Sequence, residues 1–157
     1  MSKRVVTLIV NGTEHPVQVD ALDRLIDVLR DQLGMKSVKE GCSTGDCGIC
    51  AAMVDGKLVN TCLMLASQCD GRRVTTLEGL ADDPSMKKLQ GAFIANNAAQ
   101  CGFCTPAMLM ASWDLARHRT DPSTDEIKVA LSGILCRCTG YYQIIDAVHQ
   151  GCEGGRP

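Results

Sequence analysis

The segment GCSTGDCGIC, residues 41–50, decides the fold of this chain. It places Cys42, Cys47 and Cys50 in a C-x4-C-x2-C pattern, and a fourth cysteine follows at Cys62. Glycines alternate with the cysteines, which predicts an irregular loop whose backbone N–H groups approach the sulfur atoms closely. Ordinary loop glycines are the alternative. Four thiols around one loop indicate a metal site.

A second group of four cysteines lies further along the chain. It consists of a C-x2-C pair and a C-x-C pair, Cys101, Cys104, Cys136 and Cys138. The spacing of the first group is that of plant-type [2Fe-2S] clusters. Two all-cysteine sites on one short chain predict two redox centres that conduct electrons. Of the remaining cysteines, Cys69 is predicted to be buried and Cys152, beside the polar tail, to be free and exposed; neither is expected to be a ligand.

Composition narrows the class of protein. The chain has 157 residues, which is enough for one ordinary domain or two small ones. Its net charge of -2 provides no basic field for binding nucleic acid. No apolar run approaches the ~18–20 residues that span a bilayer. The apolar N-terminal run is followed by a turn at Asn11-Gly12 and not by the small-residue cleavage site of a signal peptide. We therefore expect a strand there and a cytoplasmic protein. In a reducing cytosol, an even number of cysteines indicates metal binding more than disulfides.

The first half of the chain predicts a β-grasp, ferredoxin-like domain over residues 1–76. Two hairpin signals carry this prediction, one around Asn11-Gly12 and one at Asp55-Gly56. Apolar residues at helical spacing from Leu22 to Leu29 predict a helix of about three turns, with Gly34 as its C-cap. The expected strands are residues 4–10, 15–20, 51–54, 57–59 and 73–75.

The second half, residues 77–157, predicts an all-α domain, a four-helix bundle, so the fold class is α+β. Pro84 is expected to start the first helix after a linker, and Ser123 to Glu126 fits a capping box. Thr105-Pro106 and Thr139-Gly140 are predicted to cap two more helices. The expected apolar positions of these helices include Met86, Leu89, Phe93, Ile94, Met108, Leu109, Ile127, Leu131, Ile144 and Val148.

The predicted helix starts bear on the chemistry of the second group. Each of its cysteine pairs would lie at a helix N-terminus, where the dipole and unpaired N–H groups favour thiolates. Arg137, between two ligands, either offsets the charge of a cluster or is an ordinary solvated side chain. Zinc is the main alternative metal, although C-x4-C-x2-C and C-x-C are poor matches to paired zinc knuckles.

Two further cluster types do not fit. A Rieske centre needs two histidine ligands, and His15, His118 and His149 all lie away from the two cysteine groups. The C-x2-C-x2-C run of a bacterial [4Fe-4S] cluster is absent from the sequence. The expected ligands are therefore the eight cysteines alone, holding two [2Fe-2S] clusters.

Three motifs resemble those of a known family. Residues 41–50 are similar to the N-terminal cluster motif of the small iron–sulfur subunit of molybdenum hydroxylases, the xanthine oxidase and carbon monoxide dehydrogenase family. Residues 100–106, QCGFCTP, and 136–141, CRCTGY, resemble its second cluster motif. The resemblance runs from about Val5 to Val148. Ala107, where glycine is usual, and Tyr142-Gln143 depart from the pattern without removing a ligand.

The resemblance implies an electron-transfer subunit of an oxidoreductase complex. Electrons would leave a molybdenum–pterin site on a large subunit, pass the proximal cluster and then the distal one, and reach FAD on a medium subunit or another acceptor. Gln100 and Cys138 would approach the pterin; the alternative for Gln100 is to brace the helix start. The implied assembly is a dimer of heterotrimers. This chain would hold no catalytic residue and no substrate site. A free-standing ferredoxin is the alternative, but a second cluster domain favours permanent assembly.

Overall fold

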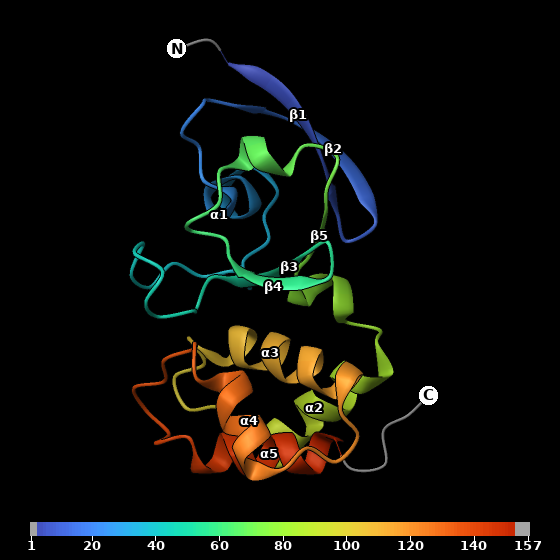
Figure 1. Ribbon diagram of the computed structural model, residues 1–157, viewed down its shortest axis with the longest axis vertical. Coiled ribbons are helices and arrows are strands. Elements are labelled where there is room, and N and C mark those ends of the chain that lie inside the picture. Colours follow the sequence, from blue (N-terminus) through green and yellow to red (C-terminus); the bar gives the residue numbers. More distant parts are fainter. Residues whose placement is uncertain (1–2, 153–157) are drawn as a thin grey trace.

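The computed structural model describes residues 3–152, with a sheet in the upper part of the view and helices in the lower part (Figure 1). The sheet has five strands in the order β2-β1-β5-β3-β4. Only the β1 and β5 pair is parallel; the other described pairs are antiparallel. The α+β class is as predicted. The strands are β1 (Arg4–Val10), β2 (Thr13–Val19), β3 (Ala51–Val54), β4 (Lys57–Asn60) and β5 (Arg73–Thr75).

Both predicted hairpins form, and β2 begins two residues earlier than expected because the turn is limited to Asn11-Gly12. The predicted three-turn helix is shorter: α1 (Leu25–Asp27) runs directly into a π-helical turn, η1 (Val28–Gln32). Leu22 precedes it and is 72% exposed. The cause is local, since the Asp23 carboxylate accepts a hydrogen bond from the Asp20 N–H and holds this segment in a turn. Gly34 ends the helix with a positive φ, as predicted.

Strand β3 is buried along its whole length because both faces of the sheet are covered there. Ala52 and Val54 point into a core with the α1 and η1 side chains. Ala51 and Met53, on the opposite face, join the core of the helical half. Alternate residues of a strand face opposite sides of a sheet, so this one short strand joins the two cores.

Four longer helices follow the sheet: α2 (Pro84–Ala95), α3 (Thr105–His118), α4 (Thr124–Leu131) and α5 (Tyr142–Cys152). Helix α3 lies between β3 and the other helices (Figure 1). Pro84 starts α2, and the capping box of α4 forms between Ser123 and Glu126, both as predicted. Ile94 was wrongly placed on the apolar face: it is 78% exposed, since Met86, Leu89 and Phe93 fill that face by themselves.

Residues 3–152 also contain two short 3-10 helices, η2 (Ala66–Cys69) and η3 (Leu77–Leu80). Cys69 is buried as predicted, whereas Cys152 is only 3% exposed and contradicts its prediction. The last turn of α5 packs closely on α2, where a Cβ at Gly151 would lie 2.7 Å from Leu89. Cys152 is therefore part of the helical core, and its burial raises the pKa of the thiol to about 11.

Glu78 in η3 is hydrogen-bonded to two residues of the sheet half, Ser37 and Thr76. Its carboxylate accepts hydrogen bonds from the Ser37 N–H at 2.8 Å, the Ser37 hydroxyl at 2.5 Å and the Thr76 hydroxyl at 2.6 Å. Burial acts to raise the pKa of Glu78, but the hydrogen bonds from Ser37 and Thr76 outweigh it and hold that pKa below its usual value. The ionised form is thus favoured in the folded state.

Replacing Glu78 with glutamine is expected to lower the free energy of unfolding at pH 7 by about 1 kcal/mol, a value reduced by solvent screening. A lowered folded-state pKa contributes stability that is complete above the unfolded pKa of about 4.3 and disappears as the pH falls through the folded value. The difference between the unfolding free energies of parent and variant should therefore shrink as the pH falls below about 4.3 and vanish below the folded-state pKa. Urea unfolding at several pH values measures it, with Glu14→Gln, at an exposed carboxylate, as the control. A difference that persists unchanged at acid pH would contradict this assignment.

Candidate iron–sulfur sites

The first cysteine group lies around the loop of residues 41–50. The Sγ atom of Cys42 accepts hydrogen bonds from the N–H groups of Thr44 and Cys47, both at 3.4 Å. Hydrogen bonding by Thr44, and then by Cys47, lowers the pKa of Cys42 to about 6. Thiolate is the form that binds metals, so the loop prepares Cys42 as a ligand.

The other three cysteines of this group are buried. Burial, followed by the neighbouring Cys50 thiol, raises the pKa of Cys62 to about 11. Apolar surroundings alone therefore leave this sulfur protonated, and a bound cation is needed to make it a thiolate. The loop also packs closely on one of these sulfurs, since a Cβ at Gly41 would lie 2.8 Å from the Sγ atom of Cys47. The donor set and this close fit suit an all-thiolate cluster.

The second group forms a cavity of about 300 Å³. All four of its cysteines line the cavity, together with Ile49, Phe103, Leu135 and Arg137. The Sγ atoms of Cys101 and Cys138 lie 3.5 Å apart, close to the ~3.8 Å between two thiolates on one tetrahedral metal with 2.3 Å bonds. Burial, then Cys136, raises the pKa of Cys104 to about 12. The structure thus brings together the two pairs that the sequence placed 32 residues apart, at Cys104 and Cys136.

The helix starts beside this cavity differ from the predictions. Helix α3 has Cys104 as its N-cap, whose carbonyl oxygen accepts from the Met108 N–H at 3.0 Å, so Thr105 is already the first helical residue. Helix α5 begins at Tyr142, and the carbonyl oxygen of Tyr141 accepts its first bond, from Ile145, at 2.9 Å. The C-x-C pair is therefore separated from α5 by the turn of residues 139–141. Only the first pair directly adjoins a helix N-terminus.

That turn supports the C-x-C pair through side chains. The Thr139 hydroxyl lies 3.1 Å from the Sγ atom of Cys136 and accepts from the Tyr141 N–H at 3.2 Å. The Tyr141 hydroxyl accepts a hydrogen bond from the Cys136 N–H at 2.9 Å and donates to the Ile134 carbonyl oxygen at 3.2 Å. The two polar side chains therefore fix the backbone on both sides of Cys136.

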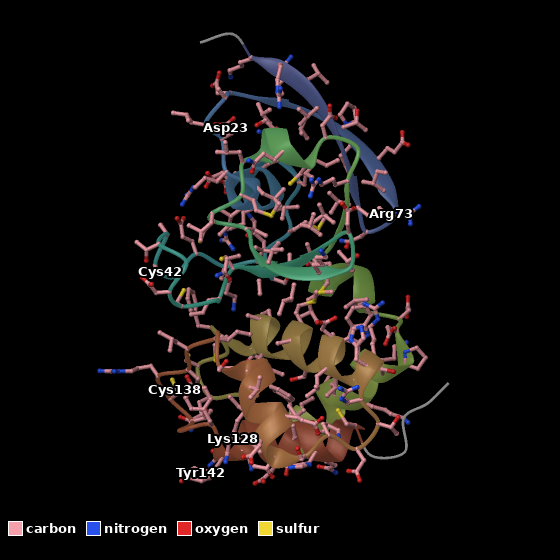
Figure 2. The ribbon with its side chains drawn as sticks, viewed as in Figure 1. Asp23, Cys42, Arg73, Lys128, Cys138 and Tyr142 are labelled. Carbon is pink, nitrogen blue, oxygen red and sulfur yellow. The ribbon has the colours of Figure 1, made fainter. Side chains whose placement is uncertain are left out.

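The two cysteine groups lie on the same side of the molecule, and Cys42 and Cys138 mark them in Figure 2. The Leu135 N–H donates to the carbonyl oxygen of Cys47 at 2.9 Å, so the backbone of one loop is hydrogen-bonded to that of the other. Gly48 permits this approach: with φ +66, its Cβ would lie 2.0 Å from the carbonyl oxygen of Gly133. The loops are in direct contact.

Comparison with known proteins agrees with this arrangement. Residues 8–78 match the 2Fe-2S iron-sulfur cluster binding domain family, and residues 76–149 match the [2Fe-2S] binding domain family. The chain is 44% identical over 153 residues to the nicotinate dehydrogenase small FeS subunit of Eubacterium barkeri, with 98% of each chain covered. It is 45% identical to the nicotine 6-hydroxylase small subunit of Paenarthrobacter nicotinovorans, covering 88% of this chain and 84% of that one. This chain belongs to the small iron–sulfur subunits of the molybdenum hydroxylases.

Solved structures agree with the family assignment. A chain of quinoline 2-oxidoreductase from Pseudomonas putida 86 superimposes on this iron–sulfur subunit with a TM-score of 0.89 at 38% identity, covering 94% of this chain and 91% of that one. Aldehyde oxidoreductase from Desulfovibrio desulfuricans gives 0.87 at 40% identity, and there the subunit corresponds to only 17% of the longer chain. The subunit is thus part of an oxidoreductase. Within residues 3–152, no helix is long and apolar enough to cross a membrane.

The structure also shows the surroundings of the other residues that the sequence analysis singled out. Gln100 is exposed in the turn before Cys101. Ala107 is buried, so its methyl group packs inside the helical core. Arg137 is exposed at the cavity rim. At the second departure from the family pattern, Tyr142 is 78% exposed, while the side-chain oxygen of Gln143 is buried without a partner among the described residues.

Sequence reasoning missed three residues that support the sites: Lys39, Thr139 and Tyr141. Thr139 and Tyr141 belong to the motif CRCTGY at residues 136–141. Nothing in the sequence shows that the Tyr141 hydroxyl accepts a hydrogen bond from the N–H of Cys136, five positions earlier. Lys39 precedes the first cysteine loop and contacts the second. Polar side chains next to cysteines in turn segments are the only signal that points to such residues.

Replacing Tyr141 with phenylalanine is expected to destabilise the iron–sulfur subunit by about 1–3 kcal/mol, because the Cys136 N–H loses its partner. The second site should also lose metal affinity by about 10–100-fold, the usual effect of removing an outer-shell partner. Thermal unfolding and iron content after chelator challenge measure the two effects. Tyr142→Phe removes the neighbouring exposed hydroxyl and should change neither. Equal behaviour of the two variants would contradict the role of Tyr141.

Proposed function

We propose that this chain carries electrons between two [2Fe-2S] clusters inside a molybdenum hydroxylase. Each cluster supplies one-electron redox chemistry when bound. The distal cluster would be held by Cys42, Cys47, Cys50 and Cys62, and the proximal cluster by Cys101, Cys104, Cys136 and Cys138. The observation that carries this proposal is that all four cysteines of the second group line one cavity, and that the backbone of their segment is hydrogen-bonded to that of the first cysteine loop.

The same proposal divides the chain into a β-grasp domain at residues 1–76, for the distal cluster, and a four-helix bundle at 77–157, for the proximal one. Two features support it. Each half has its own core, and the two family matches change over near residue 77. Residues 1–2 and 153–157 lie outside the described part of the chain.

We infer the direction of electron flow from exposure. Cys101 and Cys138 are exposed, whereas three of the four distal cysteines are buried. The proximal site is thus open toward a partner, as expected if electrons from a molybdenum–pterin subunit enter there. Gln100 and Cys138, both exposed, are proposed to contact the pterin. The distal cluster would then deliver electrons to FAD on a medium subunit or to another acceptor.

The contact between the loops supports passage from one cluster to the other. From Cys136, the backbone reaches Leu135, whose N–H donates to the carbonyl oxygen of the distal ligand Cys47. Ile49 of the distal loop also lines the proximal cavity. Close-packed and hydrogen-bonded atoms between the clusters provide a short path, and electron tunnelling falls steeply with distance. The subunit contributes to the reaction by holding this geometry.

Substrate choice is proposed to lie on another chain. Relatives are named for nicotinate, nicotine and quinoline, although they resemble this chain over most of its length. The small subunit can therefore serve several substrates with one architecture. We further propose a dimer of heterotrimers in the cytoplasm, where reduced thiols are available for cluster assembly.

Affinity purification from the native host tests the proposal. A tag on this chain is expected to retain one subunit with molybdenum–pterin and one with FAD, identified by metal and flavin analysis of the eluted complex. If the chain carries two iron–sulfur clusters but elutes alone, it is a free carrier and the subunit proposal is wrong. If molybdenum co-elutes without flavin, only the FAD subunit is wrong.

A further inference from the structure

Lys39 connects the two cysteine loops through its side chain. It lies three residues before Cys42, at the entrance to the first loop. Its Nζ atom donates a hydrogen bond of 2.9 Å to the carbonyl oxygen of Gly102 and lies 5.2 Å from the centre of the Phe103 ring. Both contacts are with the segment between Cys101 and Cys104. A cation over an aromatic face is an attractive contact. The hydrogen bond and the cation–π contact therefore both hold the Lys39 ammonium group at this position.

The charge of Lys39 is not neutralised by a nearby carboxylate. None of the ion pairs formed within residues 3–152 includes this lysine. The adjacent Glu40 is paired elsewhere, with Arg24 at 2.6 Å. Lys39 is also partly buried, where solvent screens a charge less than at the open surface. A positive charge without an ion-pair partner among the described residues therefore lies against the segment between Cys101 and Cys104.

We propose that Lys39 is a positioning residue that fastens the proximal loop to the distal one and that its charge favours the reduced form of the proximal cluster. An all-thiolate cluster is anionic, and reduction adds one more negative charge. A fixed cation close to the cluster stabilises the more negative state. This inference rests on the proposed function, because it needs a cluster at the proximal site.

The test is a redox titration, followed by EPR, of the native complex purified through this chain. Lys39→Met removes the charge and keeps an apolar stem against Phe103. At a fixed potential it should lower the ratio of reduced to oxidised proximal cluster about tenfold, or about 59 mV for a one-electron couple. Lys39→Arg keeps the charge and should stay within about twofold of the parent. Loss of one signal in Cys42→Ser identifies which spectrum is distal.

Lys36→Met is the matched control. This lysine lies three residues earlier and also donates to a backbone carbonyl oxygen, that of Arg30 at 2.6 Å, but the contact is away from the cysteine loops. It should leave both potentials unchanged. The proposal is overturned if Lys39→Met leaves the proximal ratio unchanged, if Lys36→Met shifts it equally, or if Lys39→Met loses the proximal iron, which would assign the residue to folding. A parent complex without two clusters would instead refute the proposed function.

Discussion

Replacing Gly48 with alanine is expected to lower the free energy of unfolding by more than about 3 kcal/mol, the combined effect of a strained backbone and an overpacked contact. The left-handed φ of +66 disfavours any side chain, and the added Cβ would lie 2.0 Å from the carbonyl oxygen of Gly133. Both partners in this collision are backbone, so the loops must move apart. Chemical denaturation of the purified chain measures the loss.

Gly34→Ala is the control that separates the cost of a left-handed backbone from the cost of the steric clash with Gly133. Gly34 has a similar φ of +73, but a Cβ added there would meet nothing within 4 Å. It should cost only the left-handed penalty of about 1–2 kcal/mol. Gly48→Ala should also slow electron transfer between the clusters, because the hydrogen bond from Leu135 to Cys47 lies beside this contact. If the two variants are equally stable, the close approach of the loops is wrong.

Replacing Cys42 with serine is expected to remove the distal cluster and to reduce turnover with the physiological acceptor by more than about a hundredfold. Losing an outer-shell partner of a metal costs up to about a hundredfold, and losing a direct ligand should cost more. The loop prepares this thiol by hydrogen bonds that lower its pKa to about 6, and a hydroxyl is a far weaker ligand for iron. Reduction of the molybdenum subunit by substrate should persist, because the proximal site remains intact. Stopped-flow reduction and steady-state turnover measure the two steps separately.

Cys69→Ser provides the matched control for this prediction. Cys69 is buried in the same half of the chain, and its thiol donates a weak hydrogen bond of 3.8 Å to the Leu65 carbonyl oxygen. The same change of sulfur to oxygen there should leave the iron content at the parental value. Normal turnover in Cys42→Ser would contradict the proposed order of electron flow.

The cysteine spacing and the hairpin signals predicted much of the fold. A turn of Asn-Gly or Asp-Gly needs positive φ at both positions, and Asn11 and Asp55 do adopt it. Capping chemistry was equally local at Ser123. Three predictions of burial or exposure were wrong. Ile94 is exposed and Cys152 is buried, because the packing of distant segments decides which apolar residue is covered. Leu22 is exposed because the hydrogen bond between the Asp20 N–H and the Asp23 carboxylate holds its segment in a turn.

In the candidate sites, too, local features could be predicted from the sequence and tertiary contacts could not. Spacing indicated the cysteine groups, because the C-x4-C-x2-C run, the C-x2-C pair and the C-x-C pair each place potential ligands close together along the chain. The contact of Lys39 with residue 102 and that of Leu135 with Cys47 join segments 63 and 88 residues apart in the sequence. No local pattern specifies such pairs. They arise because the helical half packs against one face of β3 and brings its loops beside the first cysteine loop.

The most direct test of the central claim is iron and acid-labile sulfide per chain in anaerobically purified protein, with EPR of the reduced sample. Two [2Fe-2S] centres require about four irons and four sulfides per chain and two distinct EPR signals. That result would confirm that both cysteine groups hold clusters. Zinc without sulfide, or a single cluster, would show that at least one group is structural and that this chain does not carry electrons from one centre to the other.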